Sequence, residues 1–475
     1  MTVVRRGPRR GRGRLLALAL VAAALCGGGV LGDVAARQPP RVVLQPSALA
    51  AEAAPAGSAS STWYCPAGPG EDAGTTHVVL ANAAAQRVRI GVVVVSARGE
   101  RRRVALRLGP HAESALTPGR LVHGAWLASG IEVAGGAVSA TEVVDGRKGR
   151  SLASCASEVS PRWYFASGST ASGSTLSVTL FNPTPNLAVV DLAFVTGTGD
   201  TVPAPFQGLV VEPWALRTLT VGRYVQNQRS VATVVAARAG AVVAGELELY
   251  GPGGTAGLSL SLGAPAASRR WNLPSVEDLA GGMSDLAVFN PSSRRERVVA
   301  TVRLATGPVE PFTETLGPQS VWTLVTSDQL RIAAQEPYTV EVRSTGPGTV
   351  VARTGAGGPR SPAPWWAAAA AVDALQSSAA RRWLVPALPG AVQQSAGVLA
   401  VENPAARPVA AEVVWWTRSG TRRLRRLQVP AHGRATLNAP SRAAVVRADA
   451  PLAVIADASP PGTAGVVGIP AVPLR

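Results

Sequence analysis

The amino-acid sequence predicts an all-β protein: about four tandem immunoglobulin-like β-sandwich repeats that follow an N-terminal signal or anchor helix. Three observations support this fold class. The chain has an internal repeat of about one hundred residues, its apolar and polar residues alternate in short runs, and 50 glycines and 38 prolines occur among 475 residues. Fixed-period self-similarity indicates a repeat architecture, and frequent turn residues favour short strands. We expect about seven strands per repeat, as in immunoglobulin-like sandwiches.

The repeat is defined by a tryptophan that precedes an asparagine at a nearly constant distance. The distance is 19 residues in the first three pairs and 20 in the last, and the pairs are Trp63/Asn82, Trp163/Asn182, Trp271/Asn290 and Trp383/Asn403. Proline follows the asparagine except in the first pair, where Ala83 stands. We expect the tryptophan in the core, and the asparagine at a strand end where proline stops further pairing. A β-propeller with two blades per repeat is the alternative, because a blade takes roughly 40–50 residues.

The repeat positions and the composition divide the chain into seven segments. These are 1–36, a signal peptide or membrane anchor; 37–61, a disordered Ala/Pro/Ser linker; 62–157, 161–265 and 269–355, the first three β-repeats; 356–380, an Ala/Pro-rich linker; and 381–475, the fourth β-repeat. The second linker contains a run of alanines after Trp365-Trp366. Since alanine has the highest helix propensity, we expect one short helix there.

The N-terminus has the pattern of an export signal. Six arginines lie within residues 1–14, and an unbroken apolar run, Leu15 to Leu25, follows them. This pattern predicts that the repeats are extracytoplasmic, either secreted or anchored in the cell membrane through an uncleaved N-terminal helix. The apolar span is at the lower limit of what crosses a bilayer, so both outcomes stay open.

The formal net charge of +17 comes from 46 basic and 29 acidic residues, and Lys148 is the only lysine. Outside the leader, arginines cluster near predicted hairpins at 101–103, at Arg294, Arg295 and Arg297, and at Arg418, Arg422, Arg423, Arg425 and Arg426. Such clusters protect exposed strand edges, or they attract envelope polyanions, polysaccharide or anionic lipid headgroups. No nucleic-acid-binding motif accompanies them, so nucleic acid is not an expected partner.

Two pairs of residues are the candidate sites. Cys65 and Cys155 flank the first repeat, and an exported domain with two cysteines usually forms a disulfide; two buried thiols are the alternative. Trp415 and Trp416 are neighbours in a predicted strand, so they face opposite sides of the sheet. One of the two rings is therefore expected either to bind a sugar or to pack against a neighbouring domain.

No catalytic residue, cofactor site or metal site is predicted. The acidic residues of the last strands, Glu142, Glu246, Glu248 and Asp457, are candidates for the paired carboxylates of glycoside hydrolysis. However, Glu246 and Glu248 alternate with leucines, which places them on an expected solvent face. The four histidines have no spacing typical of a metal site. The protein is therefore not expected to be an enzyme.

The arginine-rich leader, the Trp63-Tyr-Cys-Pro66 opening and the Trp…Leu-Phe-Asn-Pro repeats resemble an uncharacterised actinobacterial family of exported proteins that is known only as a domain of unknown function. The resemblance implies an architecture of β-repeats and no activity. We therefore expect a non-enzymatic envelope protein, a scaffold or adhesion-type array that contacts envelope polyanions, polysaccharide or another envelope protein. The alternative is an envelope protein that binds or processes carbohydrate.

Overall fold

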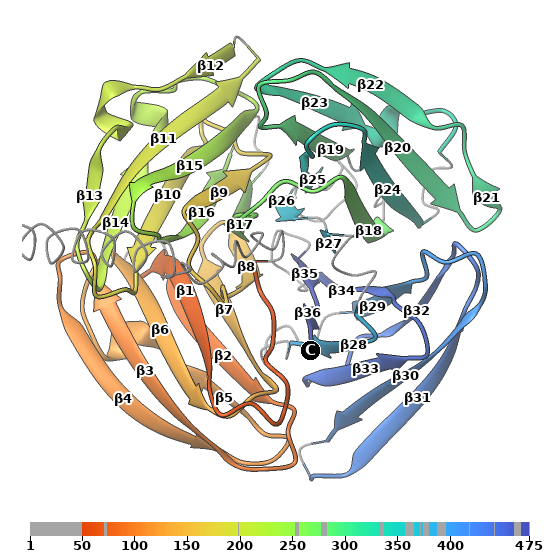
Figure 1. Ribbon diagram of the computed structural model, residues 1–475, viewed down its shortest axis with the longest axis horizontal. Helices are drawn as coiled ribbons and strands as arrows, with labels where there is room; N and C mark the ends of the chain where they lie inside the picture. Colours follow the sequence, from red (N-terminus) through yellow and green to blue (C-terminus); the bar gives the residue numbers. More distant parts are fainter. Residues whose placement is uncertain are drawn as a thin grey trace, which may run out of the picture. The chain divides into compact units, whose positions relative to one another are not determined.

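The computed structural model describes residues 50–70, 74–197, 199–251, 256–276, 283–332, 337–356, 365–370, 372–373, 380–386, 396–417, 419–440, 442–459 and 467–474. These residues belong to one compact unit, Ser47–Arg475. The expected signal or anchor segment 1–36, and the linker up to residue 49, lie outside the described residues. Strands dominate, and no α-helix occurs in the described ranges. Figure 1 shows the chain passing through four groups of strands in sequence order.

Repeat 1 is a sandwich of two four-stranded antiparallel sheets, with strand orders β1-β6-β3-β4 and β5-β2-β7-β8. The strands are β1 (Ser61–Pro69), β2 (Thr75–Asn82), β3 (Val88–Ser96), β4 (Arg101–Leu108), β5 (Glu113–Leu116), β6 (Trp126–Ala134), β7 (Val138–Gly146) and β8 (Gly149–Ser154). Apolar residues that alternate along β2, β3 and β6 meet Trp63 between the sheets and form the core.

Repeat 2 has the same plan, with one sheet in the order β12-β11-β15-β9 and the other formed by β14-β10-β16-β17. The strands are β9 (Arg162–Phe165), β10 (Thr175–Asn182), β11 (Ala188–Thr196), β12 (Gly199–Thr201), β13 (Leu209–Val211), β14 (Ala215–Thr220), β15 (Val231–Ala239), β16 (Val243–Tyr250) and β17 (Ala256–Leu262). Trp163 lies in the core between these sheets.

Repeat 3 contributes β18 (Arg270–Val276), β19 (Met283–Asn290), β20 (Glu296–Leu304), β21 (Gly307–Pro308), β22 (Phe312–Leu316), β23 (Ser320–Val325), β24 (Tyr338–Ser344), β25 (Val350–Ala356), β26 (Trp365–Ala370) and β27 (Val372–Asp373). Repeat 4 contributes β28 (Arg382–Val385), β29 (Ala396–Glu402), β30 (Val409–Trp416), β31 (Arg422–Val429), β32 (Arg434–Asn438), β33 (Ala444–Ala448), β34 (Ala453–Ser459), β35 (Val467–Pro470) and β36 (Val472–Pro473). Each repeat again has two sheets around one tryptophan, Trp271 or Trp383.

The four repeats are thus tandem β-sandwiches, each with its own core, as the alternating pattern predicts. The cores contain the expected tryptophans, of which Trp163, Trp271 and Trp383 are exposed by 2% or less. The alternative of a β-propeller with two blades per repeat is not shown by the described residues, in which the two sheets of each repeat pack around one core.

The prediction of a short helix within 356–380 is wrong, because this segment contains the strands β26 and β27. β26 pairs with β25 of its own repeat and, in parallel, with β17 of repeat 2, and it thereby joins two sheets into one of eight strands. In the other repeats the equivalent strands are β8, β17 and β35, which follow β7, β16 and β34 as β26 follows β25 here. β8 contacts β17, β17 contacts β26, β26 contacts β35, and β35 contacts β8. Strand pairing in the interior therefore overrides the helix propensity of alanine.

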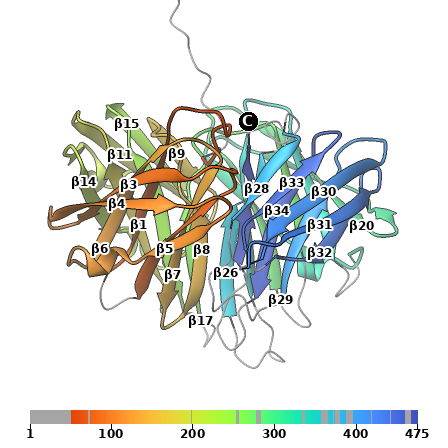
Figure 2. The ribbon, with the colours of Figure 1, turned by 90° about the horizontal axis from the view of Figure 1, so that it is seen from below.

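Neighbouring repeats are joined by buried side chains. Val95 and Ala128 of repeat 1 pack against Phe181 and Leu216 of repeat 2. A second apolar cluster joins repeats 2 and 3. Leu384, Val445, Val472 and Leu474 of repeat 4 pack into the core cluster of repeat 1. The last repeat therefore contacts the first, and Figure 2 shows the orange strands of repeat 1 beside the blue strands of repeat 4.

The end of the segment expected to be a disordered linker is instead packed at this contact. Ala53 is fully buried, and its amide donates a hydrogen bond to the carbonyl of Pro473 at 2.9 Å. The carbonyl of Ala54 accepts from the amide of Ala137 in repeat 1 at 2.7 Å. Composition alone predicts disorder for this segment, but two folded repeats supply the hydrogen bonds that order it.

Candidate functional site

The recurring asparagine holds one loop arrangement in every repeat. Asn182 Nδ2 donates to the carbonyls of Asn186 and Val211 at 2.7 and 2.9 Å, and its Oδ1 accepts from the amide of Thr184 at 3.0 Å. Asn82, Asn290 and Asn403 make the same three kinds of bond. Because Asn82 does so without a following proline, the amide side chain rather than the proline determines the arrangement. All four asparagines are buried structural residues.

The tryptophans differ in one detail. Trp163 and Trp271 donate their indole N–H to the carbonyls of Val242 and Thr349, at 2.8 and 2.7 Å. The indole nitrogens of Trp63 and Trp383 are buried without a hydrogen-bond partner in the described part of the chain. The two terminal repeats therefore hold their tryptophans by apolar packing alone.

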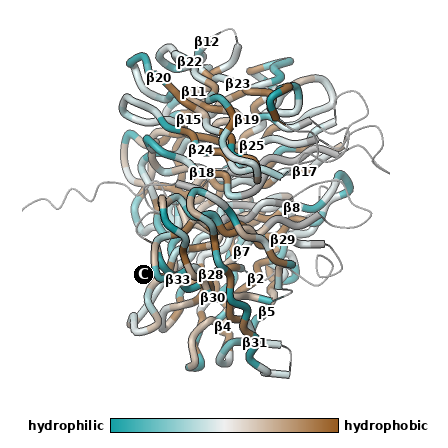
Figure 3. The backbone as a smooth tube through the Cα atoms, turned by 90° about the vertical axis from the view of Figure 1, so that its right-hand side faces the viewer, coloured by the Kyte–Doolittle hydropathy of each residue, from teal (hydrophilic) through white to brown (hydrophobic). Residues whose placement is uncertain are grey.

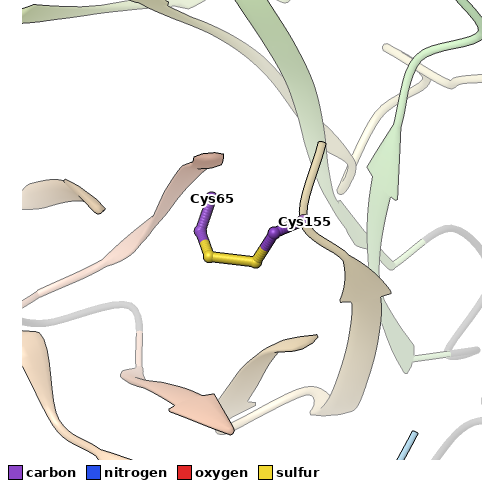
Figure 4. The surroundings of a disulfide bond; sticks show 2 residues. All are labelled: Cys65 and Cys155. Atoms are coloured by element: carbon purple, nitrogen blue, oxygen red, sulfur yellow. A yellow bond between two sulfur atoms is a disulfide. The ribbon is translucent and has the colours of Figure 1, made fainter. Parts of the chain in front are cut away.

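Cys65 and Cys155 form a disulfide (Figure 4). Their Cα atoms lie 4.5 Å apart across a sequence separation of 90 residues. Cys65 lies in β1, and Cys155 directly follows β8, so the bond joins the first strand of repeat 1 to the end of its last. Both residues are fully buried within the core of repeat 1.

Trp415 and Trp416 point to opposite sides of β30, as strand geometry requires. Trp415 packs at the edge of the core of repeat 4. The ring of Trp416 stacks on His111 of repeat 1, with centroids 3.6 Å apart and an interplanar angle of 5°. Nearby, Glu113 accepts a hydrogen bond from the amide of Ala443 and pairs with Arg442. One face of Trp416 is therefore occupied by the neighbouring repeat.

His111 belongs to a set of turn residues that the sequence interpretation missed. His111, Trp214, Gln319 and His432 precede the equivalent strands β5, β14, β23 and β32, and all four have φ between 47° and 55°. This left-handed conformation costs a non-glycine residue roughly 1 kcal/mol. Trp214 packs against repeat 1, as His111 packs against repeat 4. The Trp214 ring lies so close to Gly130 of repeat 1 that a Cβ added there would be 2.8 Å from the ring. A proline one or two positions earlier is the signal in the sequence that could have identified them.

The expectation that Glu246 and Glu248 lie on a solvent face is wrong. They are 2% and 4% exposed, because β16 is covered on both faces: Leu247, between them, packs against Val144 of repeat 1. Burial raises the pKa of Glu246 to about 8, although the Thr233 hydroxyl opposes the shift. Burial, and then the charge of Glu246, raise the pKa of Glu248 well above its usual value.

Strand register identifies the equivalent positions in the other repeats. Glu246 pairs with Val178, as Glu142 pairs with Val78, and both carboxyl groups are buried. In repeat 3 the same position holds Arg353, and in repeat 4 it holds Ala456, which pairs with Leu399; Asp457 lies one residue further along β34. The register therefore spreads the acidic residues proposed as paired carboxylates over separate repeats, except for Glu246 and Glu248.

Buried charged side chains lie where repeats 3 and 4 meet. Glu341, which is 7% exposed, pairs with Arg270 at 3.0 Å, Arg343 at 2.9 Å and Arg303 at 3.6 Å. Glu402 of repeat 4 is buried close by, and burial followed by the charge of Glu341 raises its pKa to about 8. The carboxyl groups of Glu341 and Glu402 thus interact across this contact.

The arginines of β4 and β31 form an exposed basic surface, here called the arginine surface. It comprises Arg101, Arg102, Arg103 and Arg107 on β4, and Arg422, Arg423, Arg425 and Arg426 on β31, all exposed. β4 and β31 are the last strands of their sheets, and Figure 1 draws both at the outside. The tube of Figure 3 is teal, the hydrophilic colour, at β31. Arg418 lies outside the described residues, and Arg294, Arg295 and Arg297 belong to a different hairpin in repeat 3.

In the described ranges, no group of three or more His, Cys, Asp or Glu residues could hold a metal ion. None of the described residues forms a helix long and apolar enough to span a bilayer. The arginine surface and the contacts between repeats are therefore the features from which a function can be argued.

Comparison with protein families adds one decisive observation. Residues 125–383, from just before β6 into β28, match DUF5719, a family of unknown function. The chain belongs to this family. The expectation that the chain belongs to a family of unknown function is thus confirmed. The matched residues include parts of all four repeats. No curated protein matches the sequence.

Two solved structures are similar to the DUF5719 chain. The crystal structure of Thermotoga maritima 1070 is 18% identical, covers 22% of this chain and 93% of its own, and has a TM-score of 0.20. A tetra-tandem repeat in the extending region of a large adhesion protein is 14% identical, covers 82% of this chain and 93% of its own, and has a TM-score of 0.11. With TM-scores this low, function must be argued from the chain's own geometry.

Proposed function

We propose that this DUF5719 protein is a non-enzymatic extracytoplasmic envelope protein, a scaffold or adhesion-type array of β-domains. The observation that carries the proposal is the packing between repeats. Apolar clusters bury side chains between repeats 1 and 2, between 2 and 3, and between 4 and 1. An array packed in this way behaves as one body with a fixed outer surface, which is what a scaffold needs.

The proposed location is supported by the arginine-rich leader and by the disulfide. Disulfides persist in oxidising compartments outside the cytoplasm. The protein is secreted, or it is held at the cell membrane by its N-terminal segment. A reporter fused after residue 60 is expected to be active only outside the cytoplasm, and activity confined to the cytoplasm would contradict the proposal.

The scaffold role is tested by unfolding and by envelope binding of residues 50–475. We expect cooperative unfolding of all four repeats, resistance to limited proteolysis between repeats, and retention on an isolated envelope fraction without release of soluble sugar. Independent unfolding of the repeats would indicate a flexible chain of domains. Release of sugar fragments would favour the alternative, a carbohydrate-processing protein.

A further inference from the structure

The hairpins that lead to the outermost strands differ sharply in charge between repeats. In repeat 1, residues 97–108 contain five arginines, and in repeat 4, residues 417–429 also contain five. The corresponding stretches of repeats 2 and 3, 197–211 and 305–316, contain no arginine or lysine. A general arginine bias would affect all four repeats alike. The arginines are therefore concentrated in two particular repeats.

These two repeats are distant in sequence and adjacent in the structure. His111, three residues after the end of β4, stacks on Trp416, the last residue of β30. Trp416 is also the direct cross-strand partner of Arg422. Cross-strand partners have Cβ atoms about 5 Å apart. The His111–Trp416 stack therefore lies close to Arg422, at the start of β31, and a few residues beyond the end of β4. The stack thus brings the Arg107 end of β4 and the Arg422 end of β31 to the contact between repeats 1 and 4, whereas Arg101, Arg102 and Arg103 lie at the other end of β4, opposite Val95, Val94 and Val93.

Most of these arginines are not neutralised by the protein itself. Arg103 pairs with Glu132 at 2.9 Å, and Arg426 pairs with Glu412 at 3.1 Å. The other six arginines of β4 and β31 make no ion pair with any described residue: Arg101, Arg102, Arg107, Arg422, Arg423 and Arg425. Exposed cations that lie on one short strand repel one another, and an anionic partner would reduce that cost.

We propose that the arginine surface binds a linear anionic polysaccharide that runs across the contact between repeats 1 and 4. This inference rests on the proposed envelope location and names the partner class. Alternate residues on a strand share one face and lie roughly 7 Å apart, so Arg101, Arg103 and Arg107 line one face of β4, and Arg423 and Arg425 line one face of β31. Each set can contact a polymer with repeating charges. Arginine binds carboxylate or phosphate groups in a bidentate fashion, which lysine cannot do.

Two other anionic partners fit the surface less well. Single-stranded nucleic acid needs exposed aromatic rings on which its bases stack, but one face of Trp416 is occupied by His111, and Trp415 packs at the edge of its own core. A membrane surface favours apolar side chains that insert between headgroups, whereas the apolar residues of β4, Val104 and Leu106, are half-buried against the core of repeat 1.

The test compares binding of the purified chain 50–475 to polygalacturonate, a linear carboxylated polysaccharide, with binding to neutral dextran. The variant Arg422→Glu/Arg423→Glu/Arg425→Glu is expected to lower the affinity for polygalacturonate at least tenfold, and so is Arg101→Glu/Arg102→Glu/Arg107→Glu. Both triple variants together should abolish binding. The affinity of the unaltered chain should fall steeply with salt, as for other polyelectrolytes.

A matched control separates local contacts from overall charge. Arg223→Glu/Arg295→Glu/Arg297→Glu makes the same change of charge at exposed positions in repeats 2 and 3, and it should change the affinity by less than threefold. Equal loss in this control would overturn the proposal. So would tighter binding to vesicles with 30% phosphatidylglycerol, or to single-stranded DNA. Unchanged thermal unfolding of every variant shows that the fold is intact, and the reporter experiment tests the envelope location separately.

Discussion

His111 of the first repeat lies flat against Trp416 of the fourth, with ring centroids 3.6 Å apart. The two side chains come from elements that are more than 300 residues apart in the sequence. His111 occupies a left-handed turn, at φ 50°, and Trp416 ends a strand. The stack therefore reports directly on whether the last repeat stays packed on the first.

The stack is expected to contribute measurably to stability. His111→Ala and Trp416→Ala should each destabilise the chain, and a double-mutant cycle should give a coupling of about 1 kcal/mol, typical of an aromatic pair. The measurement is denaturant unfolding, with hydrogen exchange at β5 and β30 as a local readout. Strictly additive effects would show that the rings do not interact in solution.

Stability should fall as the pH rises, because of the buried carboxyl groups. Glu246 has a pKa of about 8 in the folded chain, against an ordinary value of 4.5. Its contribution is therefore fully present below about pH 4.5 and is lost progressively as the pH rises to about 8. Glu402 has the same shift and the same sign.

Thermal unfolding between pH 4.5 and 8.5 tests this dependence. Glu246→Gln and Glu402→Gln should each make the decline less steep, because glutamine carries no titrating proton. Glu158→Gln, at an exposed position in the loop after repeat 1, is the control and should leave the slope unchanged. A slope that none of the three substitutions alters would contradict the assignment.

The buried asparagine should be indispensable to its repeat. Asn182→Ala leaves the carbonyls of Asn186 and Val211 without their donor, so we expect destabilisation by about 3 kcal/mol. Asn186→Ala is the matched control, because only the backbone of this exposed residue takes part. If both variants unfold at the same denaturant concentration as the unaltered chain, the hydrogen bonds are not needed.

The disulfide should stabilise repeat 1 through the long loop that it closes. Replacing Cys65 and Cys155 together by alanine is expected to cost about 4–5 kcal/mol, from the loss of chain constraint in the unfolded state. Mass spectrometry of the non-reduced exported protein should find the two residues linked. Free thiols, or a link to a second chain, would argue against this bond.

The N-terminal segment should help to hold repeats 1 and 4 together. Ala53→Glu places a charge at a fully buried position between the two repeats. We expect it to lower the unfolding temperature and to increase proteolysis near β36. Ala51→Glu, at a half-buried position nearby, should have a smaller effect. Equal effects would show that the segment is not specifically packed.

The sequence by itself determined the strands and their grouping into four repeats, and it favoured a disulfide between the two cysteines that flank repeat 1 over two buried thiols. These features depend on local patterns: alternation of apolar residues, turn residues and a fixed distance between Trp163 and Asn182, or their counterparts. Local patterns are legible because they follow from the geometry of a single strand or turn. The family of unknown function was also indicated by these motifs.

Only the tertiary structure decided what covers each sheet. Glu246 alternates with leucines in a way that predicts a solvent face, yet a neighbouring repeat covers that strand. The alanines after Trp366 favour a helix in isolation, but pairing with strands of two repeats makes them β26. The contact of His111 with Trp416 joins distant segments of the chain. Packing between repeats depends on long-range contacts, which outweigh local propensity and leave no periodic signal in the sequence.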